Sequence, residues 1–233
     1  MNLLWQMSPA EIEAVTLSLK VAACCTLLIT LPAIGIAWLL ARKEFIGKSL
    51  LDGLVHIPMI LPPVVPGFIL LSLFGKHGWI GAWLNHYFSF NIAFTWLGAV
   101  LASAIMAFPL MVRSVRLAFT QIDIGLEQAA NTLGASPIKT FLTISVPMAL
   151  PGLLTGLILA FSRSLGEFGA TITFVGNIEG ETRTLPLAIY SYTQMPGGDL
   201  IAMRLVILCV LISLLALLAS NLCERWLLRR IGR

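Results

Sequence analysis

Charge is what this sequence has least of. Only 11% of its 233 residues are Asp, Glu, Lys or Arg, whereas 58% are hydrophobic. Soluble domains average about 25% charged and about 45–50% apolar residues. A chain this poor in charge cannot cover a globule with polar surface. This excludes a soluble enzyme, a nucleic-acid-binding protein and a secreted disulfide-bonded scaffold, and it makes lipid the solvent of the chain.

Cysteine and histidine are also scarce, and neither occurs at the spacing of a metal site. We interpret the four cysteines as small buried residues: Cys24, Cys25, Cys209 and Cys223. The three histidines read as isolated polar residues, without a nearby Ser, Asp or Glu arranged for catalysis: His56, His77 and His86. We therefore expect no metal and no catalytic residue. A membrane-embedded enzyme is the weakest hypothesis that we consider.

Long hydrophobic runs are what the sequence does have. A helix needs about 20 apolar residues to cross about 30 Å of hydrocarbon. Runs of this length predict an all-α integral membrane protein that forms a single domain over residues 1–233. We expect about five transmembrane helices, at about 14–41, 50–75, 94–117, 144–166 and 200–223.

The distribution of basic residues predicts the orientation. Most of the 15 lysines and arginines follow the first span, the third span or the last span: Arg42, Lys43, Lys48, Arg113, Arg116, Lys139, Arg225, Arg229, Arg230 and Arg233. Basic residues collect in cytoplasmic loops. We therefore expect a multi-pass protein of a bacterial cytoplasmic (inner) membrane, with an external N-terminus and a cytoplasmic C-terminus.

The external segment 167–199 does not fit a sixth span. Its apolar run at 168–178 is too short to cross the membrane, and Pro186, Pro196 and a Gly197-Gly198 turn follow. A re-entrant or gate-lining segment fits these features better.

The second span contains an unusual number of prolines: Pro58, Pro62, Pro63 and Pro66. Each proline removes a backbone donor and clashes with the preceding helical turn. Irregular backbone at membrane depth is tolerated where it is buried in protein or lines an aqueous cavity. Two interpretations stay open, a kinked packing helix and a segment that lines the substrate pathway or its gate.

Arg163 and Glu167 are the second anomaly at membrane depth. Four residues apart, they share one face of a helix and can form an ion pair. This pair could hold the end of the fourth span in register, or it could belong to a gate. Gly166 and Gly169 predict a helix break at the same place.

The cytoplasmic segment 118–147 predicts two helical pieces separated by a bend. Residues 126–133 are good helix formers, and Gly134 can end that helix in a left-handed conformation. Ser136 can then cap a second helix, with Pro137 at its first position. A helix–bend–helix on the cytoplasmic face has the form of a docking element.

This segment resembles a motif of the binding-protein-dependent ABC import permeases, E-A-A-x3-G-x9-I-x-L-P. The matching residues are Gln128, Ala129, Ala130, Gly134, Ile144 and Pro147, with Glu127 one place before the glutamate position. In that family the segment is the coupling helix, which sits in a groove of the ATPase. The resemblance implies that Glu127, Gln128, Ala129 and Gly134 carry this contact.

The resemblance covers nearly the whole chain and is closest to the molybdate branch of the family, with sulfate permeases as the relatives to confuse with it. It implies a type I importer fold, a homodimer, two cytoplasmic ABC ATPase subunits and an external binding protein that delivers molybdate. It implies no cofactor in this chain, because ATP and magnesium bind the ATPase. Tungstate, sulfate and thiosulfate stay open as cargo, and so does a scaffold that moves no solute.

Overall fold

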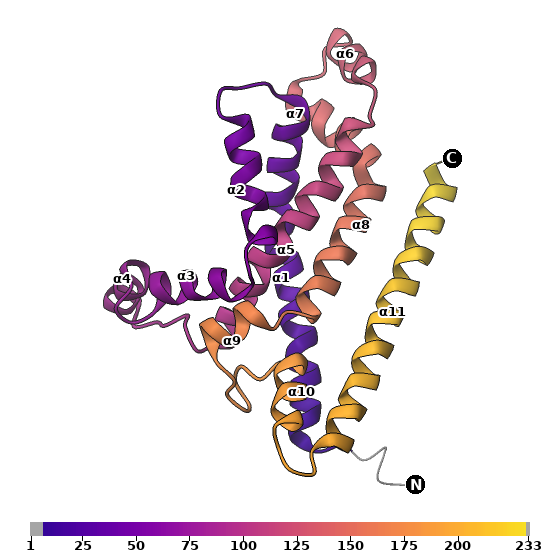
Figure 1. Cartoon of the computed structure of the whole chain (residues 1–233). Coiled ribbons are helices and arrows are strands. Elements are labelled where there is room, and N and C mark those ends of the chain that lie inside the picture. The colour runs from indigo at the N-terminus through magenta and orange to yellow at the C-terminus, as the bar shows by residue number, and fades with distance from the viewer. Residues whose placement is uncertain (1–6, 232–233) are drawn as a thin grey trace.

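The computed structural model describes residues 7–231, and for residues 219–221 and 223–231 it describes the backbone alone. All regular elements in this part of the chain are helices (Figure 1). In chain order they are α1 (Pro9–Arg42), α2 (Lys48–Ile60), α3 (Val64–Phe74), α4 (Trp79–Phe88), α5 (Trp96–Thr120), α6 (Ile124–Thr132), α7 (Pro137–Thr140), the π-helical turn η2 (Phe141–Ser145), α8 (Val146–Leu165), α9 (Gly169–Val175), α10 (Leu185–Thr193) and α11 (Asp199–Ile231).

Four helical units in the described residues are long and apolar enough to cross a bilayer: α1, α5, the continuous unit from α7 to α8, and α11. The pair α2–α3 qualifies as a fifth when its two helices are taken together. The all-helical fold and the number of candidate spans confirm the prediction of about five transmembrane helices.

Helix α5 forms the centre of the bundle and packs against both α1 and α8. Small side chains fill this contact: Ala22, Ala33, Ala37, Ala99, Ala102, Ala107 and Ala160 are all fully buried. Small residues let helix backbones approach closely, which replaces the hydrophobic driving force that lipid does not supply. Close approach also lets Ser114 of α5 donate a hydrogen bond to the Gly152 carbonyl of α8, at 2.9 Å.

The proline-rich span is not one straight helix. α2 ends at Ile60, α3 begins at Val64, and the two axes differ by 109°. Pro62 and Pro63 lie at the break, where neither could continue the hydrogen-bonding ladder of α2. The interpretation of 50–75 as one kinked helix is therefore corrected: the chain turns sideways after α2.

The second helical piece after Gly134 also differs from the prediction. α7 continues through η2 into α8, so that Pro137–Leu165 is one unit of 29 residues. We expected a separate helix on the cytoplasmic face and a span beginning near 144. In the structure the π-helical turn joins the two without a break, because Ser145 and Val146 keep helical dihedrals.

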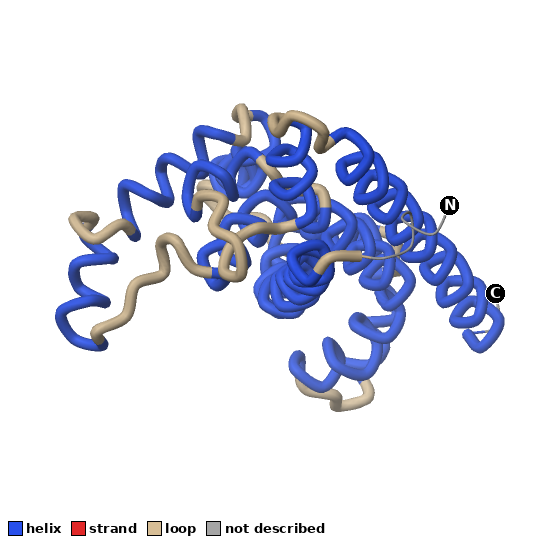
Figure 2. The backbone as a smooth tube through the Cα atoms, turned by 90° about the horizontal axis from the view of Figure 1, so that it is seen from below, coloured by secondary structure: helices blue, strands red, loops and turns tan. Residues whose placement is uncertain are grey.

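The bundle has two distinct ends (Figure 1). We call the end with α6 and the loop after α1 the α6 end, and the end with α10 and the start of α1 the α10 end. α3 and α4 project sideways from the bundle, and α11 lies on its other side, as Figures 1 and 2 show. The predicted basic tail lies outside the described side chains: Arg225, Arg229, Arg230 and Arg233, together with Cys223.

Candidate functional site

The segment after α5 folds as its local signals predict. The Asp123 carboxylate caps α6 by accepting a hydrogen bond from the Gly125 N–H, at 2.8 Å. At the other end Gly134 has a φ of 87°, and the N–H of Ala135 donates to the carbonyl of Ala130 at 3.0 Å. This is the hydrogen-bonding pattern of a Schellman motif, in which glycine takes the left-handed position without steric cost. The predicted helix end at Gly134 is confirmed.

The predicted start of the next helix is confirmed as well. The Ser136 hydroxyl accepts a hydrogen bond from the Lys139 N–H, and Pro137 occupies the first helical position. A second bond ties the two helices together, since Thr140 Oγ1 donates to Asn131 Oδ1 at 3.1 Å. The angle between α6 and α7 is thus held by capping groups and one side-chain bond.

Glu127 has a different environment from its neighbours in the motif. Its Oε1 accepts a hydrogen bond from Arg42 of α1 at 3.1 Å and another from Ser145 of η2 at 2.8 Å. We call these three residues the Glu127 clamp. The Glu127 side chain is only 18% exposed, whereas Gln128 and Ala129 are exposed. The carboxylate therefore binds within its own chain, and its expected contact with the ATPase stays a prediction.

An apolar surface surrounds the bend between α6 and α7. Leu133 is 88% exposed and Ile138 is 73% exposed. Other large apolar side chains on the same segment are also exposed: Ile124, Leu126 and Leu142. We call these five residues the α6 apolar surface. Exposed apolar groups gathered on a short segment are typical of a protein-interaction site.

At the other end of α8, Arg163 and Glu167 form the predicted ion pair, with 2.6 Å between Nη1 and Oε2. The side chain of Glu167 is 1% exposed. Its second oxygen accepts a hydrogen bond from the backbone N–H of Ala170 at 2.8 Å, in the first turn of α9. The break predicted at Gly166 is confirmed, because α8 ends at Leu165 and α9 begins at Gly169.

The proline break and the Arg163–Glu167 region lie against each other. A Cβ on Gly169 would lie 2.6 Å from Cβ of Pro63, and a Cβ on Gly67 would lie 2.6 Å from the carbonyl oxygen of Ala170. Helices α3 and α9 therefore pack backbone to backbone. We call the residues Pro63, Gly67, Glu167, Gly169 and Ala170 the gate cluster. Pro62 directly precedes it in the chain, and Pro66 is buried in α3 beside Gly67.

Comparison with known proteins shows the family to which the chain belongs. Residues 33–233 match the family described as "Binding-protein-dependent transport system inner membrane component". The chain belongs to this family of inner membrane permeases.

Individual relatives agree with the family. The chain is 53% identical to the "Molybdenum transport system permease protein ModB" of Haemophilus influenzae, over 96% of this chain and 97% of the relative. It is 52% identical to the protein of the same name from Escherichia coli, with the same coverage. Its fold is similar to a permease chain in the crystal structure of a bacterial alginate ABC transporter in complex with an alginate-pentasaccharide-bound periplasmic protein. That match has a TM-score of 0.77 at 18% identity and covers 100% of this chain and 82% of the other.

One polar cluster of the permease was not predicted. Asp52 Oδ1 of α2 lies 2.9 Å from Nη1 of Arg116 on α5 and 3.2 Å from Nδ1 of His56. The prediction that His56 is isolated is therefore wrong. The i,i+4 spacing of Asp52 and His56 was the signal available in the sequence. The partner on α5, 64 residues away, had no signal.

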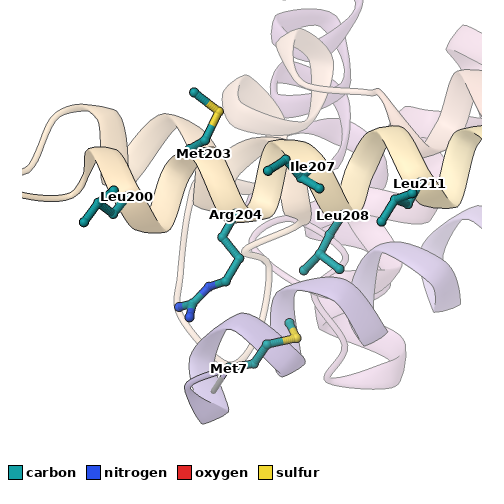
Figure 3. A pocket seen from close by; sticks show the side chains of 7 residues that line it. All are labelled: Met7, Leu200, Met203, Arg204, Ile207, Leu208 and Leu211. Atoms are coloured by element: carbon teal, nitrogen blue, oxygen red, sulfur yellow. The ribbon is translucent and has the colours of Figure 1, made fainter. Parts of the chain in front are cut away.

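A groove between α11 and the start of α1 is not an anion site. It encloses about 260 Å³, and its wall is apolar apart from Arg204 (Figure 3). Figure 3 shows the Arg204 side chain directed from α11 toward the first turns of α1. There it forms an ion pair with the fully buried Glu11. Because Glu11 already neutralises Arg204, the pair joins the two terminal helices of the permease.

No group of three or more His, Cys, Asp or Glu side chains in the described residues is arranged to hold a metal ion. The α6 apolar surface offers a docking site, and the gate cluster offers a tightly packed joint at the end of α8.

Proposed function

We propose that this chain is the membrane-spanning subunit of an ATP-driven importer, and that it translocates molybdate by alternating access. Two relatives at 52–53% identity over nearly their full length carry the name of molybdenum transport permeases. The observation that carries the mechanism is the α6 apolar surface, which is exposed at one end of a bundle and is tied to two spans by the Glu127 clamp.

The proposed partners follow from that surface and from the family. Two ABC ATPase subunits, which bind ATP and magnesium, dock on the α6 apolar surface of a permease homodimer. Gln128, Ala129 and Ala130 lie on the docking helix, and Gly134 shapes its end. Ile144 and Pro147 complete the motif in the helix that leads to α8. An external binding protein delivers the anion at the α10 end.

The proposed orientation places the α6 end in the cytoplasm and the N-terminus outside. The α6 end carries the basic residues Arg42, Lys43, Lys48 and Lys139. The α10 end carries four acidic residues, Glu11, Glu13, Glu179 and Glu181, and its basic residues Arg183 and Arg204 are paired with two of them. This distribution follows the positive-inside rule.

In the proposed mechanism the ATPases move α6 when they close on ATP. The Glu127 clamp passes the displacement to α1 through Arg42 and to the helix of α8 through Ser145. At the other end of α8, the Arg163–Glu167 pair and the bond to Ala170 pass it to α9. Helix α9 packs on α3. A movement of α9 therefore moves α3 and the proline break, and this opens or closes the proposed external gate.

The proposed gate residues are Pro62, Pro63, Pro66, Arg163 and Glu167. The ion pair holds α9 in place, and the prolines leave backbone carbonyls of α2 without helical partners beside the joint. Discontinuous helices of this kind occur at transport pathways, where irregular backbone is tolerated because it lines a cavity.

Uptake of radioactive molybdate tests the function. Cells that hold the ATPase and binding protein are compared with and without this chain, with tungstate and sulfate as separate competitors. Uptake that depends on the chain and is blocked by tungstate but not by sulfate supports the proposal. Strong competition by sulfate assigns the chain to a related oxyanion, which is the alternative cargo. Absence of chain-dependent uptake for all three anions contradicts the proposed cargo.

A further inference from the structure

The corner between α3 and α4 forms an open cavity of about 580 Å³ with a mostly apolar wall, separate from the gate cluster. Its wall includes Lys76 and His77 from the turn between the two helices, and Asn91 and Phe94 from the loop before α5. No Asp or Glu lines it. No ion pair joins Lys76 or His77 to a carboxylate among the side chains that the structure describes. Lys76 therefore gives the cavity a positive charge that no carboxylate of the wall neutralises.

The corner is shaped by close backbone packing. A Cβ on Gly78 would overlap the carbonyl oxygens of Ser72 and Leu73, and a Cβ on Gly81 would overlap those of Phe74 and Gly75. Only glycine allows α4 to begin this close to the end of α3. The positions of the neighbouring Lys76 and His77 are fixed by this packing.

Two energetically unfavourable features lie in the wall of the same cavity. Phe94 has a φ of 62°, a left-handed conformation that bulky residues rarely adopt. Asn91 Oδ1 is buried, with no hydrogen-bond partner among the described residues. Strained backbone and unsatisfied polar groups concentrate where a fold is shaped for a ligand. Because Oδ1 accepts hydrogen bonds, Asn91 suits a hydroxyl or N–H donor of the ligand rather than an anionic oxygen.

The location of the cavity identifies the source of the anion. α3 and α4 project from the bundle near the level where two of the candidate spans have an end, since α5 begins and α8 ends there (Figure 1). α4 also exposes a set of aromatic side chains: Trp79, Trp83, Tyr87 and Phe88. Aromatic residues of this kind collect at the membrane interface, at the depth of lipid headgroups. The anionic group available at that depth is a phosphate ester.

We propose that this cavity binds the phosphate of a phospholipid headgroup, with Lys76 and His77 as the ligands. Lysine is a common phosphate ligand, and a charge-assisted hydrogen bond is among the stronger polar contacts. The aromatic side chains of α4 lie against the acyl region beside it. The bound lipid thus holds the α3–α4 arm in the interface, while the gate cluster holds its other end.

Native mass spectrometry of the purified full chain tests the site, with phosphatidylglycerol as the probe. The double variant Lys76→Gln/His77→Gln should retain about tenfold less lipid than the wild type, because losing a charge-assisted hydrogen bond weakens binding by at least that factor. Ser72→Trp, which fills the cavity and keeps both charges, should give the same loss. The matched control is Lys48→Gln, which removes one lysine charge outside the cavity and away from α4 and should retain lipid as the wild type does.

Three results would overturn the proposal. Equal loss in the control would mean that the lipid follows net charge alone. Undiminished binding in Ser72→Trp would place the lipid elsewhere, including the case in which a second copy of the chain covers the cavity. Displacement of the lipid by millimolar inorganic phosphate would assign the cavity to a free oxyanion. Far-ultraviolet circular dichroism checks the fold of each variant, and Ser72→Trp keeps the test decisive if the double variant does not fold.

Discussion

The two ends of the helix unit Pro137–Leu165 are built in opposite ways. At the α6 end, Leu133 and Ile138 are exposed, and Arg42 and Ser145 hold α6 through the Glu127 carboxylate. At the gate cluster, Glu167 is fully buried, and glycines bring the backbones of α3 and α9 together. One end is an exposed surface held by polar side chains, and the other is a buried joint held by close packing.

This difference predicts how the α6 end and the gate cluster respond to amino-acid substitutions. The Glu127 clamp is partly buried, with side-chain exposures of 8% for Arg42 and 18% for Glu127, so its loss should cost less folding free energy than the loss of a fully buried pair. Water does not replace a fully buried pair or a backbone contact. Substitutions in the gate cluster should therefore reduce the amount of folded protein, whereas those near α6 should reduce transport and leave folding intact.

The largest effect is expected for Glu167→Lys. The new ammonium group would be buried beside the guanidinium of Arg163, which is only partly exposed, and breaking a buried ion pair costs about 3–5 kcal/mol. We expect little folded protein in the membrane and no molybdate uptake, as measured by membrane yield and by a thermal unfolding assay. The control is Glu179→Lys, which removes the exposed i,i+4 pair with Arg183 and should cost about 0.3–0.5 kcal/mol. Normal yield of Glu167→Lys would contradict the buried pair.

Gly169→Ala tests the backbone contact. The new Cβ would lie 2.6 Å from that of Pro63, and overpacking of this kind costs about 1–3 kcal/mol. We expect a lower unfolding temperature and strongly reduced uptake. Gly35→Ala is the matched control, since a Cβ there meets nothing within 4 Å. Equal behaviour of the two variants would mean that α3 and α9 do not pack as described.

Gly134→Asp should separate transport from folding. Its φ of 87° costs a non-glycine residue about 1–2 kcal/mol, but open space surrounds the position. We expect normal membrane insertion with uptake abolished, because α6 loses its end and its angle to α7. Gly134→Asn, which tolerates the left-handed conformation better, should keep part of the uptake. Full uptake by Gly134→Asp would remove the basis for the docking role of α6.

The smallest effect is expected for Glu127→Gln. The amide can still accept the bond from Ser145 but loses the ion pair with Arg42, which costs about 1–2 kcal/mol at this partly buried site. We expect normal yield and uptake reduced several-fold, since α1 no longer follows α6. Glu44→Gln, which breaks an exposed pair with Lys48, serves as the control. If both variants transport equally well, the Glu127 clamp does not carry the movement.

Sequence features that lie close together in the chain predicted much of the structure at both ends of the helix unit Pro137–Leu165. Gly134, Ser136 and Pro137 mark a helix end and a helix start within a few residues, and the structure has both there. The Arg163–Glu167 pair follows from a spacing of four on one helix. In each case the determining residues are neighbours in the chain, so the sequence alone contains the information.

Contacts between distant segments were not predictable in this way. Arg42 and Glu127 are 85 residues apart, and Pro63 meets Gly169 from another helix. No periodicity in one sequence encodes such pairs. The sideways turn after α2 was missed for a related reason. Prolines predict a break, but the direction of the next helix depends on α9, which fits against α3 only because Gly67 and Gly169 have no side chain.

The uninterrupted helix from Pro137 to Leu165 also has the geometry of a lever. Its 29 residues, at about 1.5 Å per residue, span about 44 Å. A tilt of about 5° at one end would therefore move the far end by about 4 Å. In the proposed importer, a rod of this length would turn a small rotation at the docked end into a larger displacement at the gate cluster. A shorter helix would reduce this displacement without altering the Glu127 clamp at one end or the Arg163–Glu167 pair at the other.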